Sequence, residues 1–319
     1  MSLLGIDLGG TKLAIAVISS SGDIIHKESI KLEGREGKQV GALVTYVIGV
    51  VLKAERFSKD PVHSIGICVP GIIRMNMGTV WAPNIPGWEN YALMDEVKSI
   101  AGNVPVIIDS DRTCYLQGEI WKGNAKGCKD AIYLSVGTGI GAGIITDGKI
   151  LRGSQNISGA IGWMALNKPF VKEFTECGNF EYFSSGKGIA RLAQDILKAA
   201  ISYEGQLRNK NIEDINSHDV FVAYENDDEI ALNVMSVCVE YWGMAVANLI
   251  SLFNPAKIIL GGGIFGPAVS LIPEIKEEAS KWAQPISMQQ VSIEASELGS
   301  DAGVYGAAYL ALHAIHPGI

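Results

Sequence analysis

Two stretches of this chain, residues 3–30 and 131–150, repeat one pattern of apolar strands and glycine-containing turns. In each stretch, runs of strand-forming residues alternate with turn residues, first at a glycine cluster and then at a tight turn. The second copy contains Asp147-Gly148, a pair typical of hairpin turns. Two copies of one plan predict two related α/β domains that face each other across a cleft. The expected strands are 3–8, 13–19 and 24–30 in the first copy, and 131–136, 141–146 and a short strand after residue 148 in the second.

Helical periodicity accounts for much of the remaining chain. Val40, Val44, Val47 and Val51 recur every three or four positions, which predicts a helix over 40–56. Because no low-complexity linker interrupts the sequence, we expect short hinges near residues 110 and 300. The expected domains are a smaller one of residues 1–109 plus about 301–319 and a larger one of residues 110–300. Further helices are expected at 93–100, 111–123, 187–203, 229–253 and from 301 onward, with further strands at 64–69, 104–108, 257–260 and 290–293.

The composition argues against two classes of partner. The chain has 319 residues, of which 48% are hydrophobic, so it can bury enough apolar surface for two domains. Its net charge of -8 argues against a nucleic-acid groove, which needs a basic face to neutralise phosphates. The same charge gives no attraction to anionic lipids. We therefore expect neither nucleic acid nor membrane as a partner.

Three features indicate a cytoplasmic location. The first twelve residues lack a basic flank, and Asp7 interrupts their apolar run, so we expect no export signal. The uncharged segment 241–256 is shorter than the roughly 18 residues of a membrane span, and we expect it to form part of a buried helix. The five cysteines lie far apart without a CxxC pair, which favours reduced thiols.

Glycine-rich turns follow three of the expected strands, at residues 7–12, 136–143 and 259–266. Each turn alone is as easily explained by a backbone that needs positive φ. Together they favour an anion site, because glycine lets backbone N–H groups approach a phosphate closely. The spacing matches neither the lysine-containing P-loop nor the first-strand GxGxxG of dinucleotide-binding folds. The pattern therefore predicts a nucleoside triphosphate cradle of another kind.

Polar side chains in these turns suit the same ligand. The hydroxyls of Thr11 and Thr138 add donors, and Lys12 adds a cation. Asp7 is placed to hold Mg²⁺ directly or through water.

These motifs carry a resemblance to a known family. The sequence resembles the ROK group of sugar kinases and repressors, within the actin-like ATPase fold of hexokinases, over nearly its whole length. The segments that carry the resemblance are DLGGTK (7–12), ICVPGII (67–73), PNIPGW (83–88), PVIIDSD (105–111), VGTGIGAGIITDGKILRG (136–153), SGAIG (158–162), NPAKIILGGGIFG (254–266) and SDAGVYGAA (300–308).

The resemblance implies a fold, an activity and a set of ligands. The fold is α/β with two actin-like (ribonuclease H-like) ATPase domains and an interdomain cleft. The activity is MgATP-dependent phosphorylation of a hexose or N-acylhexosamine by a homodimer. The implied nucleotide-binding residues are Gly9, Gly10, Thr11 and Lys12 at the terminal phosphates, Gly137, Thr138 and Gly139 at the second phosphate turn, and Gly261, Gly262 and Gly263 near the adenosine.

Asp111 is the candidate general base. It follows a predicted strand at the start of a predicted helix, so the pattern alone favours a helix N-cap formed by Asp111, Asp109 or Ser110. The resemblance reverses this preference, because Asp111 falls on the aspartate of the family's Asn-Asp catalytic motif. Ser110 and Thr113 stand where typical members have asparagine, and Arg112 replaces a small residue. Serine has one donor and a shorter reach than an amide, so substrate positioning is expected to differ.

The sugar side departs further from the family. Ala160 and Trp163 replace the sugar-binding glutamate and the histidine that touches both sugar and zinc. Trp163 either stacks on a sugar face or packs in the core. Glu181 matches the second sugar-binding glutamate, with a solvent-exposed charge as the alternative.

Gly71 and Asn84 are further sugar-side candidates, and a turn-forming role is the alternative for Asn84. Cys177 alone remains of the family's histidine and three cysteines, so no structural zinc is expected.

Two other functions are alternatives to the kinase. A sugar-responsive repressor needs a helix-turn-helix ahead of this domain, and the first phosphate strand begins at residue 3 without room for one. A non-catalytic or specialised sugar- and nucleotide-binding protein is favoured by Ser110, Ala160 and Trp163.

Overall fold

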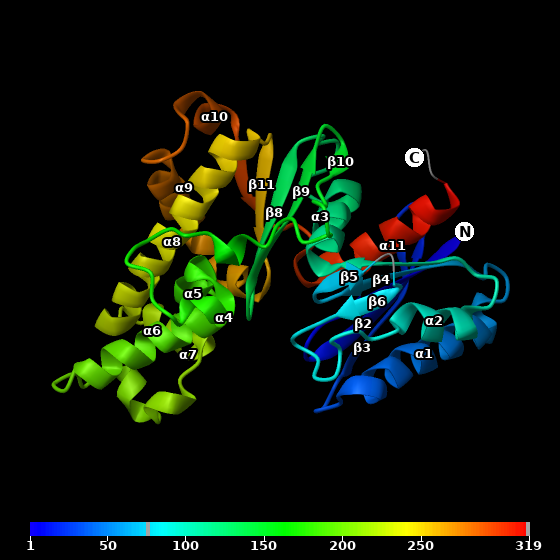
Figure 1. Ribbon diagram of the computed structural model, residues 1–319, viewed down its shortest axis with the longest axis horizontal. Helices are drawn as coiled ribbons and strands as arrows, with labels where there is room; N and C mark the ends of the chain where they lie inside the picture. The colour runs from blue at the N-terminus through cyan, green and yellow to red at the C-terminus, as the bar shows by residue number, and fades with distance from the viewer. Residues whose placement is uncertain (75–76, 317–319) are drawn as a thin grey trace. The chain divides into compact units, whose positions relative to one another are not determined.

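A five-stranded mixed sheet forms the centre of the first half of the chain (Figure 1). Its order is β3 (Ile24–Lys31), β2 (Lys12–Ser19), β1 (Ser2–Leu8), β4 (Val62–Val69) and β7 (Val106–Ser110). β1 pairs with β2 and β2 with β3 in antiparallel register, whereas β1 with β4 and β4 with β7 are parallel. Asp7 and Ser110 therefore both lie at the carboxyl ends of parallel strands, at one edge of the sheet.

A second sheet repeats this plan. Its order is β10 (Lys149–Ile150), β9 (Ile140–Thr146), β8 (Ala131–Val136), β11 (Lys257–Gly261) and β12 (Ser292–Ala295). β8 and β9 are antiparallel, whereas β8, β11 and β12 are parallel neighbours. The duplication predicted from the two strand-and-turn patterns is confirmed.

The computed structural model describes residues 1–74 and 77–316, and the chain divides into two units. Unit 1 comprises Met1–Gly127, Ile150–Ser158 and Ser296–Ile319, and unit 2 comprises Cys128–Lys149 and Gly159–Ala295. The expected domain division placed the helix after Ser110 in the second domain, whereas that helix lies in unit 1.

Helices cover both faces of the unit 1 sheet (Figure 1). On one face, α1 (Gly37–Lys53) and α2 (Leu93–Ala101) pack against the even-numbered apolar residues of β1, such as Leu4 and Ile6. On the other face, α11 (Ala302–Ile315) packs against Leu3 and its neighbours, and α3 (Asp111–Lys122) lies beside α11. This alternation follows from the period of two along a strand.

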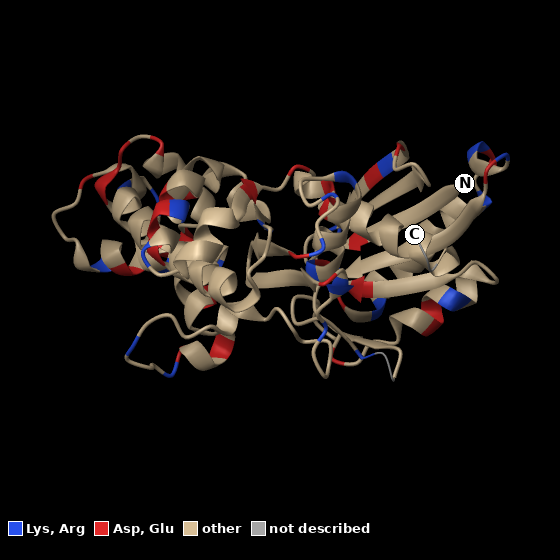
Figure 2. Cartoon of the chain, turned by 90° about the horizontal axis from the view of Figure 1, so that it is seen from above, with Lys and Arg blue, Asp and Glu red and all other residues tan. Residues whose placement is uncertain are grey.

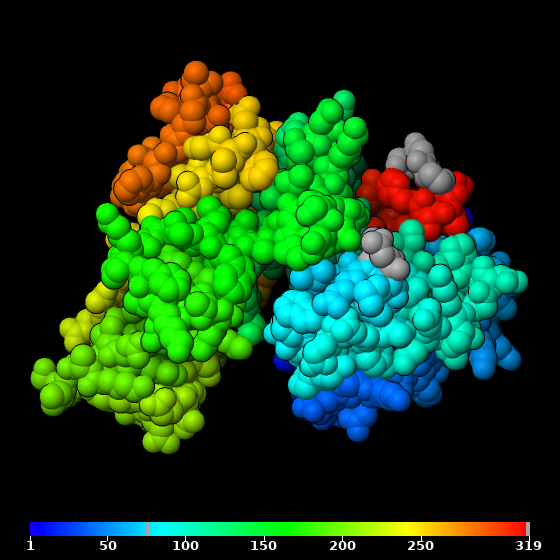
Figure 3. Space-filling view, in the orientation of Figure 1, coloured from blue at the N-terminus to red at the C-terminus, as the bar shows by residue number. Residues whose placement is uncertain are grey.

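Glycine allows α11 to approach the sheet. A methyl group at Gly66 would lie 1.7 Å from the backbone oxygen of Ala307, and one at Gly5 would lie 2.3 Å from that of Val304. In the space-filling view, α11, in red, lies beside the part of this unit drawn in cyan and light blue (Figure 3).

Unit 2 is built around the long helix α8 (Glu229–Phe253). Asp228 caps its start by accepting bonds from two backbone N–H groups, and Asn254 ends it in the left-handed region at φ 44°. α8 is long and apolar enough to span a membrane, yet 61% of its apolar window is buried, as expected for a core helix. The other helices of the unit are α4 (Phe174–Cys177), α5 (Asn179–Ser184), α6 (Gly186–Ala199), α7 (Ser217–Tyr224), α9 (Ile272–Ser280) and α10 (Pro285–Gln290).

Several short elements complete the fold. The loop between β4 and α2 contains a two-stranded hairpin, β5 (Ile72–Arg74) with β6 (Thr79–Trp81). The 3₁₀ turns are Glu55–Phe57, Ile161–Trp163 (η2), Gln206–Asn209, Ile212–Asp214, Gly263–Phe265, Pro267–Leu271 and Gly299–Asp301.

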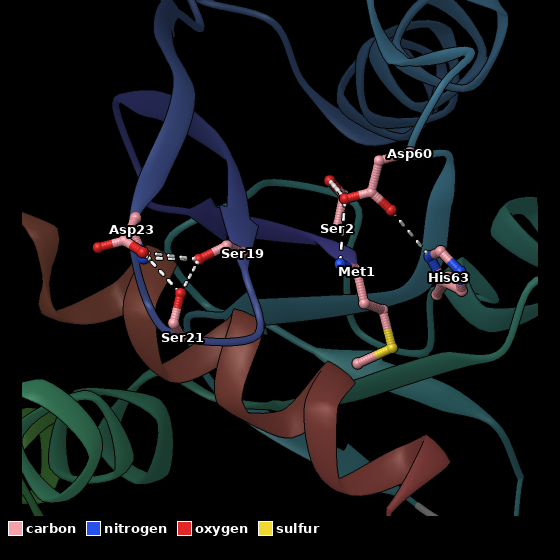
Figure 4. Close-up of polar contacts among 7 residues, drawn as sticks. All are labelled: Met1, Ser2, Ser19, Ser21, Asp23, Asp60 and His63. Carbon is pink, nitrogen blue, oxygen red and sulfur yellow. Dashed lines mark hydrogen bonds and ion pairs between the residues drawn. The ribbon is translucent and has the colours of Figure 1, made fainter.

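Polar contacts hold the start of the central strand β1 and the turn between β2 and β3 (Figure 4). Asp60 binds the Met1 amino group at 3.1 Å and the Ser2 hydroxyl at 3.0 Å. At the turn between β2 and β3, the Ser21 hydroxyl donates to Asp23 at 2.6 Å. Along the backbone of both units, Lys and Arg are interspersed with Asp and Glu (Figure 2).

Candidate active site

The first glycine turn joins β1 to β2 in unit 1. The Gly9 N–H donates to the Lys12 backbone oxygen at 2.9 Å, which closes the turn and leaves Gly10, Thr11 and Lys12 exposed. Asn84 lies beside this turn. A methyl group placed on Gly10 would be only 3.4 Å from the Asn84 Cβ. The structure thus brings Asn84 next to the predicted phosphate turn.

Asp7, the last residue but one of β1, has one carboxylate oxygen free for a ligand. Its Oδ1 is buried and has no hydrogen-bond partner among the described residues. Burial raises the pKa of Asp7, opposed by the Cys68 thiol and then by Lys12. Gly303 leaves room for the carboxylate, since a methyl group there would lie 2.2 Å from Oδ2. An unpartnered buried carboxylate oxygen suits Mg²⁺, so the side chain fits the predicted cation.

Asp111 is the first residue of α3 and is half-buried. Its Oδ1 accepts the Arg112 backbone N–H at 2.8 Å, and no other hydrogen bond joins it to a described residue. Burial raises the pKa of Asp111 to about 6; Arg112 opposes this shift, and the charge of Asp7 adds to it. A carboxylate with this pKa accepts a proton more readily than an ordinary aspartate.

Of the three residues considered for the N-cap of α3, it is not Asp111 that occupies this position. Ser110 occupies the cap position, and its side chain makes no capping bond. The Ser110 hydroxyl instead lies 3.2 Å from that of Thr113. Asp111 is therefore the first helical residue, where one carboxylate oxygen accepts a first-turn N–H and the other makes no hydrogen bond to a described residue.

Asp109 has a different environment from Asp111. Its buried carboxylate is bound by Arg152 at 3.0 and 2.6 Å, and it also accepts the Ser110 backbone N–H at 2.8 Å. These groups line a small polar cavity with Thr113 and Ser158. Sequence reasoning missed Arg152, whose only signal was its place in the segment that carries the family resemblance.

Gly71 follows Pro70 at φ 132°, and a methyl group there would lie 2.0 Å from the Trp81 backbone oxygen. Close backbone approach to β6 therefore requires glycine at this position.

The second glycine turn lines a pocket in unit 2. The Gly137 N–H donates to the Gly139 backbone oxygen at 2.9 Å, and the Gly186 N–H donates to the Gly137 oxygen at 2.7 Å. The start of α6 is thereby joined to the turn. The pocket is lined by Gly137, Thr138, Gly186, Lys187, Ala190, Asn216, Ser217, Gly263 and Ile264.

Three predicted glycines lie outside this lining. A methyl group at Gly261 would be 2.0 Å from the Tyr133 hydroxyl, and one at Gly262 would be 2.4 Å from the Val136 backbone oxygen. A methyl group at Gly139 would be 2.9 Å from the Glu181 Oε2. Gly262 needs glycine, because its φ is 86° and its close neighbour is backbone. Gly261 and Gly139 face the ends of side chains, and Gly263 has open space in front of it.

Sequence reasoning missed the polar residues that α6 and α7 bring to the pocket. Lys187 is exposed, and no hydrogen bond or ion pair joins it to another described residue. Asn216 and Ser217 begin α7 on the same pocket. The helix starts were recognisable signals, but their meeting at one pocket depends on tertiary packing.

The structure does not support a solvent-exposed charge at Glu181 or core packing of Trp163. The Glu181 carboxylate is half-buried and accepts the Ile140 backbone N–H at 2.6 Å, so it is not a free surface charge. Trp163 is 56% exposed, so it is not a core residue.

Cys177 lies at the end of α4. Within residues 1–74 and 77–316, no three His, Cys, Asp or Glu side chains are grouped to hold a metal ion. The absence of zinc stays a prediction, to be tested by metal analysis of the purified protein.

Comparison with known proteins gives this geometry a context. Residues 3–314 match the ROK family. The chain belongs to this family. The ROK resemblance expected from the motifs is thus confirmed. A glucokinase of Halalkalibacterium halodurans is 33% identical, with 96% of this chain aligned to 94% of that one. A xylose repressor of Caldicellulosiruptor bescii is 31% identical over 96% of this chain and 76% of that protein.

Solved ROK structures share the fold. A ROK hexokinase from Thermus thermophilus matches with a TM-score of 0.79 and 25% identity over all of both chains. A ROK glucokinase from Streptomyces griseus, solved with glucose and AMPPNP, has the same score and identity over 98% of this chain and 100% of that one. These relatives confirm the expected actin-like ATPase fold class, and they support a sugar kinase.

Proposed function

We propose that this ROK protein uses MgATP to phosphorylate a hydroxyl of a hexose or an N-acylhexosamine, with Asp111 as the general base. The observation that carries the proposal is the Asp111 carboxylate, half-buried, with a pKa raised to about 6 and a single hydrogen-bond partner among the described residues. At pH 7 such a group is mostly ionised and ready to take a proton.

In the proposed reaction, the phosphoryl group passes from ATP to the sugar hydroxyl, and no further reactant is needed. The acceptor hydroxyl gives its proton to Asp111 as its oxygen bonds to the γ-phosphorus of ATP. The bond from that phosphorus to the β-phosphate oxygen breaks, so sugar phosphate and ADP are formed. Asp111 then releases its proton to solvent.

Unit 1 residues supply the rest of the acceptor and cation chemistry in this proposal. Asp7 holds Mg²⁺, directly or through water, and Mg²⁺ supplies charge neutralisation on the phosphates. The Gly9–Lys12 turn binds the terminal phosphates. Gly71, Asn84 and Ser110 contact the sugar, as the matched family positions suggest.

Unit 2 residues supply the nucleotide site. The Gly137–Gly139 turn binds phosphates through its backbone, and Gly261, Gly262 and Gly263 lie near the adenosine. The unit 2 pocket supports this assignment, because Gly137, Thr138 and Gly263 line it together. Glu181 and Trp163 complete the proposed sugar contacts.

A specialised sugar- and nucleotide-binding protein is the second candidate. The altered side chains at Ser110, Ala160 and Trp163 favour it, because a hydroxyl, a methyl and an exposed ring replace an amide, a carboxylate and an imidazole of the family pattern. We further propose that the protein acts in the cytoplasm as a homodimer.

Coupled ADP release with MgATP, across hexoses, N-acetylhexosamines and ketoses, decides between the two candidates. The kinase proposal expects sugar-dependent release with one preferred acceptor. ATP binding without release on any sugar would favour the binding protein, and sequence-specific DNA binding would favour a regulator.

A further inference from the structure

The Glu181 side chain joins α5 to the second phosphate turn. Its Oε2 accepts the Ile140 backbone N–H at 2.6 Å, directly after the turn. Hydrogen bonds between a carboxylate and a backbone N–H are among the stronger ones in proteins. The turn therefore depends on a side chain 41 residues away in the sequence.

Two glycines create the space for this carboxylate. A methyl group at Gly139 or at Gly162 would lie 2.9 Å from Glu181 Oε2. Neither glycine has a positive φ, so the closeness of Glu181 constrains these positions. The turn, η2 and α5 thus meet at one carboxylate.

The same chain segment also holds the other end of the turn. Five residues after Glu181, the Gly186 N–H donates to the Gly137 backbone oxygen at 2.7 Å. The N–H of Ile140 and the carbonyl of Gly137 are both bound, while Thr138 between them stays exposed on the pocket. Because both ends of the turn are held, its backbone loses less conformational entropy when a ligand binds.

Two cations lie close enough to the Glu181 carboxylate to offset part of the cost of burying its charge. Burial raises its pKa, whereas the Ile140 N–H and then Lys187 and Arg191 lower it. An unbalanced carboxylate here would repel the phosphates of a nucleotide. The local cations therefore allow an acidic side chain to stand beside a phosphate turn.

We propose that Glu181 is a positioning residue for the nucleotide: its carboxylate holds the Gly137–Ile140 backbone in the shape that binds phosphate, before any sugar is present. This inference rests on the proposed nucleotide site and adds a role that a sugar contact alone does not require. It makes nucleotide affinity in the absence of sugar depend on Glu181.

The test is calorimetric titration of MgADP into the full chain without sugar. Glu181→Ala removes the acceptor, and Glu181→Asp keeps the charge but shortens the reach. Glu181→Gln keeps an oxygen at the same distance. The control is Glu176→Ala, which removes an exposed carboxylate of the neighbouring α4.

We expect Glu181→Ala and Glu181→Asp to weaken MgADP binding roughly tenfold or more, because the Ile140 N–H loses its acceptor and the turn loses its fixed shape. We expect Glu181→Gln and Glu176→Ala to stay within about threefold of the native affinity. MgADP binding by both Ala and Asp variants as tight as by the native protein would overturn the proposal.

Hydrogen exchange of the unliganded protein separates this inference from the proposed function. The Ile140 N–H should exchange faster in Glu181→Ala and Glu181→Asp, but not in the Gln variant or the control. Unchanged exchange in Glu181→Asp would refute the positioning role even if the Ala variant failed to fold. A native protein that binds no MgADP would refute the nucleotide site itself.

Discussion

Both terminal nitrogens of Arg152 bind the carboxylate of Asp109, at 3.0 and 2.6 Å. The Asp109 side chain is only 4% exposed, so the guanidinium is its main source of charge compensation. Asp109 stands two residues before Asp111, at the junction of β7 and α3. The pair therefore fixes the backbone that presents the proposed base.

Arg152→Ala should destabilise unit 1 by about 2–4 kcal/mol, because it leaves a buried carboxylate without its cation. Arg152→Lys should cost less, since it keeps the charge but loses the two-point geometry. Urea unfolding measures both. The control is Arg35→Ala, which removes an exposed pair with Glu33 and bonds to the backbone oxygens of Lys31 and Leu32, and should cost about 1 kcal/mol. Equal losses for Arg152→Ala and Arg35→Ala would contradict the structural role.

Asp111→Asn should stabilise the protein while lowering its kcat. The folded-state pKa, about 6, lies above the ordinary value of 3.8, so the ionised carboxylate destabilises the fold. This cost is absent below about pH 4, grows between pH 4 and 6, and is complete above pH 6. The variant should therefore gain about 1–3 kcal/mol at pH 7 and little at pH 4. A gain that does not depend on pH would show that the pKa of Asp111 is not raised.

The rate should follow the same ionisation. Because the base must be unprotonated, kcat/KM should fall tenfold for each pH unit below about 6. A pH-rate profile with the preferred sugar measures this. A profile that stays flat down to pH 5 would exclude Asp111 as the titrating base.

Lys187→Ala should weaken binding of MgATP and MgADP by about fivefold to tenfold and leave adenosine binding unchanged. The reason is that Lys187 lines the unit 2 pocket beside Gly137 and Thr138, where phosphates are proposed to bind. Lys198→Ala on the same helix is the control, because Lys198 pairs with Glu213 instead. An equal loss for adenosine would place Lys187 away from the phosphates.

Gly66→Ala should destabilise unit 1 by about 3 kcal/mol, because the new methyl group would meet the backbone oxygen of Ala307 at 1.7 Å. Gly49→Ala in α1 is the matched control. Its methyl group would meet only an ordinary contact of 3.6 Å with Ile100, so it should stabilise by about 0.5–1 kcal/mol. Thermal unfolding of both variants checks the prediction, and a harmless Gly66→Ala would contradict the close approach of α11.

Long periodic elements were predictable from the sequence. The strand 131–136 and the helix 229–253 have the expected bounds, since their patterns are continuous and their ends carry turn or capping residues. The expected strand 290–293 was wrong at its start, because Pro285–Gln290 forms α10 and β12 begins at Ser292. The expected helices 40–56 and 187–203 end earlier, at Lys53 and Ala199.

Short elements and side-chain environments were not predictable. The β5–β6 hairpin and the helices α4, α5 and α7 are too short for periodicity to define them. The half-burial of Glu181 and the exposure of Trp163 depend on how η2 and α5 pack, which no local pattern records. The glycine turns were predictable as motifs, whereas the pairing of Asp109 with Arg152 required the fold.

Comparison of native protein with Asp111→Asn tests whether Asp111 is the general base. Phosphorylated sugar is quantified at pH 7 with saturating MgATP, and MgADP affinity is measured on the same samples. We expect a loss in kcat of about 10²-fold or more with nucleotide affinity within about threefold. Sugar phosphorylation by Asp111→Asn at the native rate would contradict Asp111 as the general base.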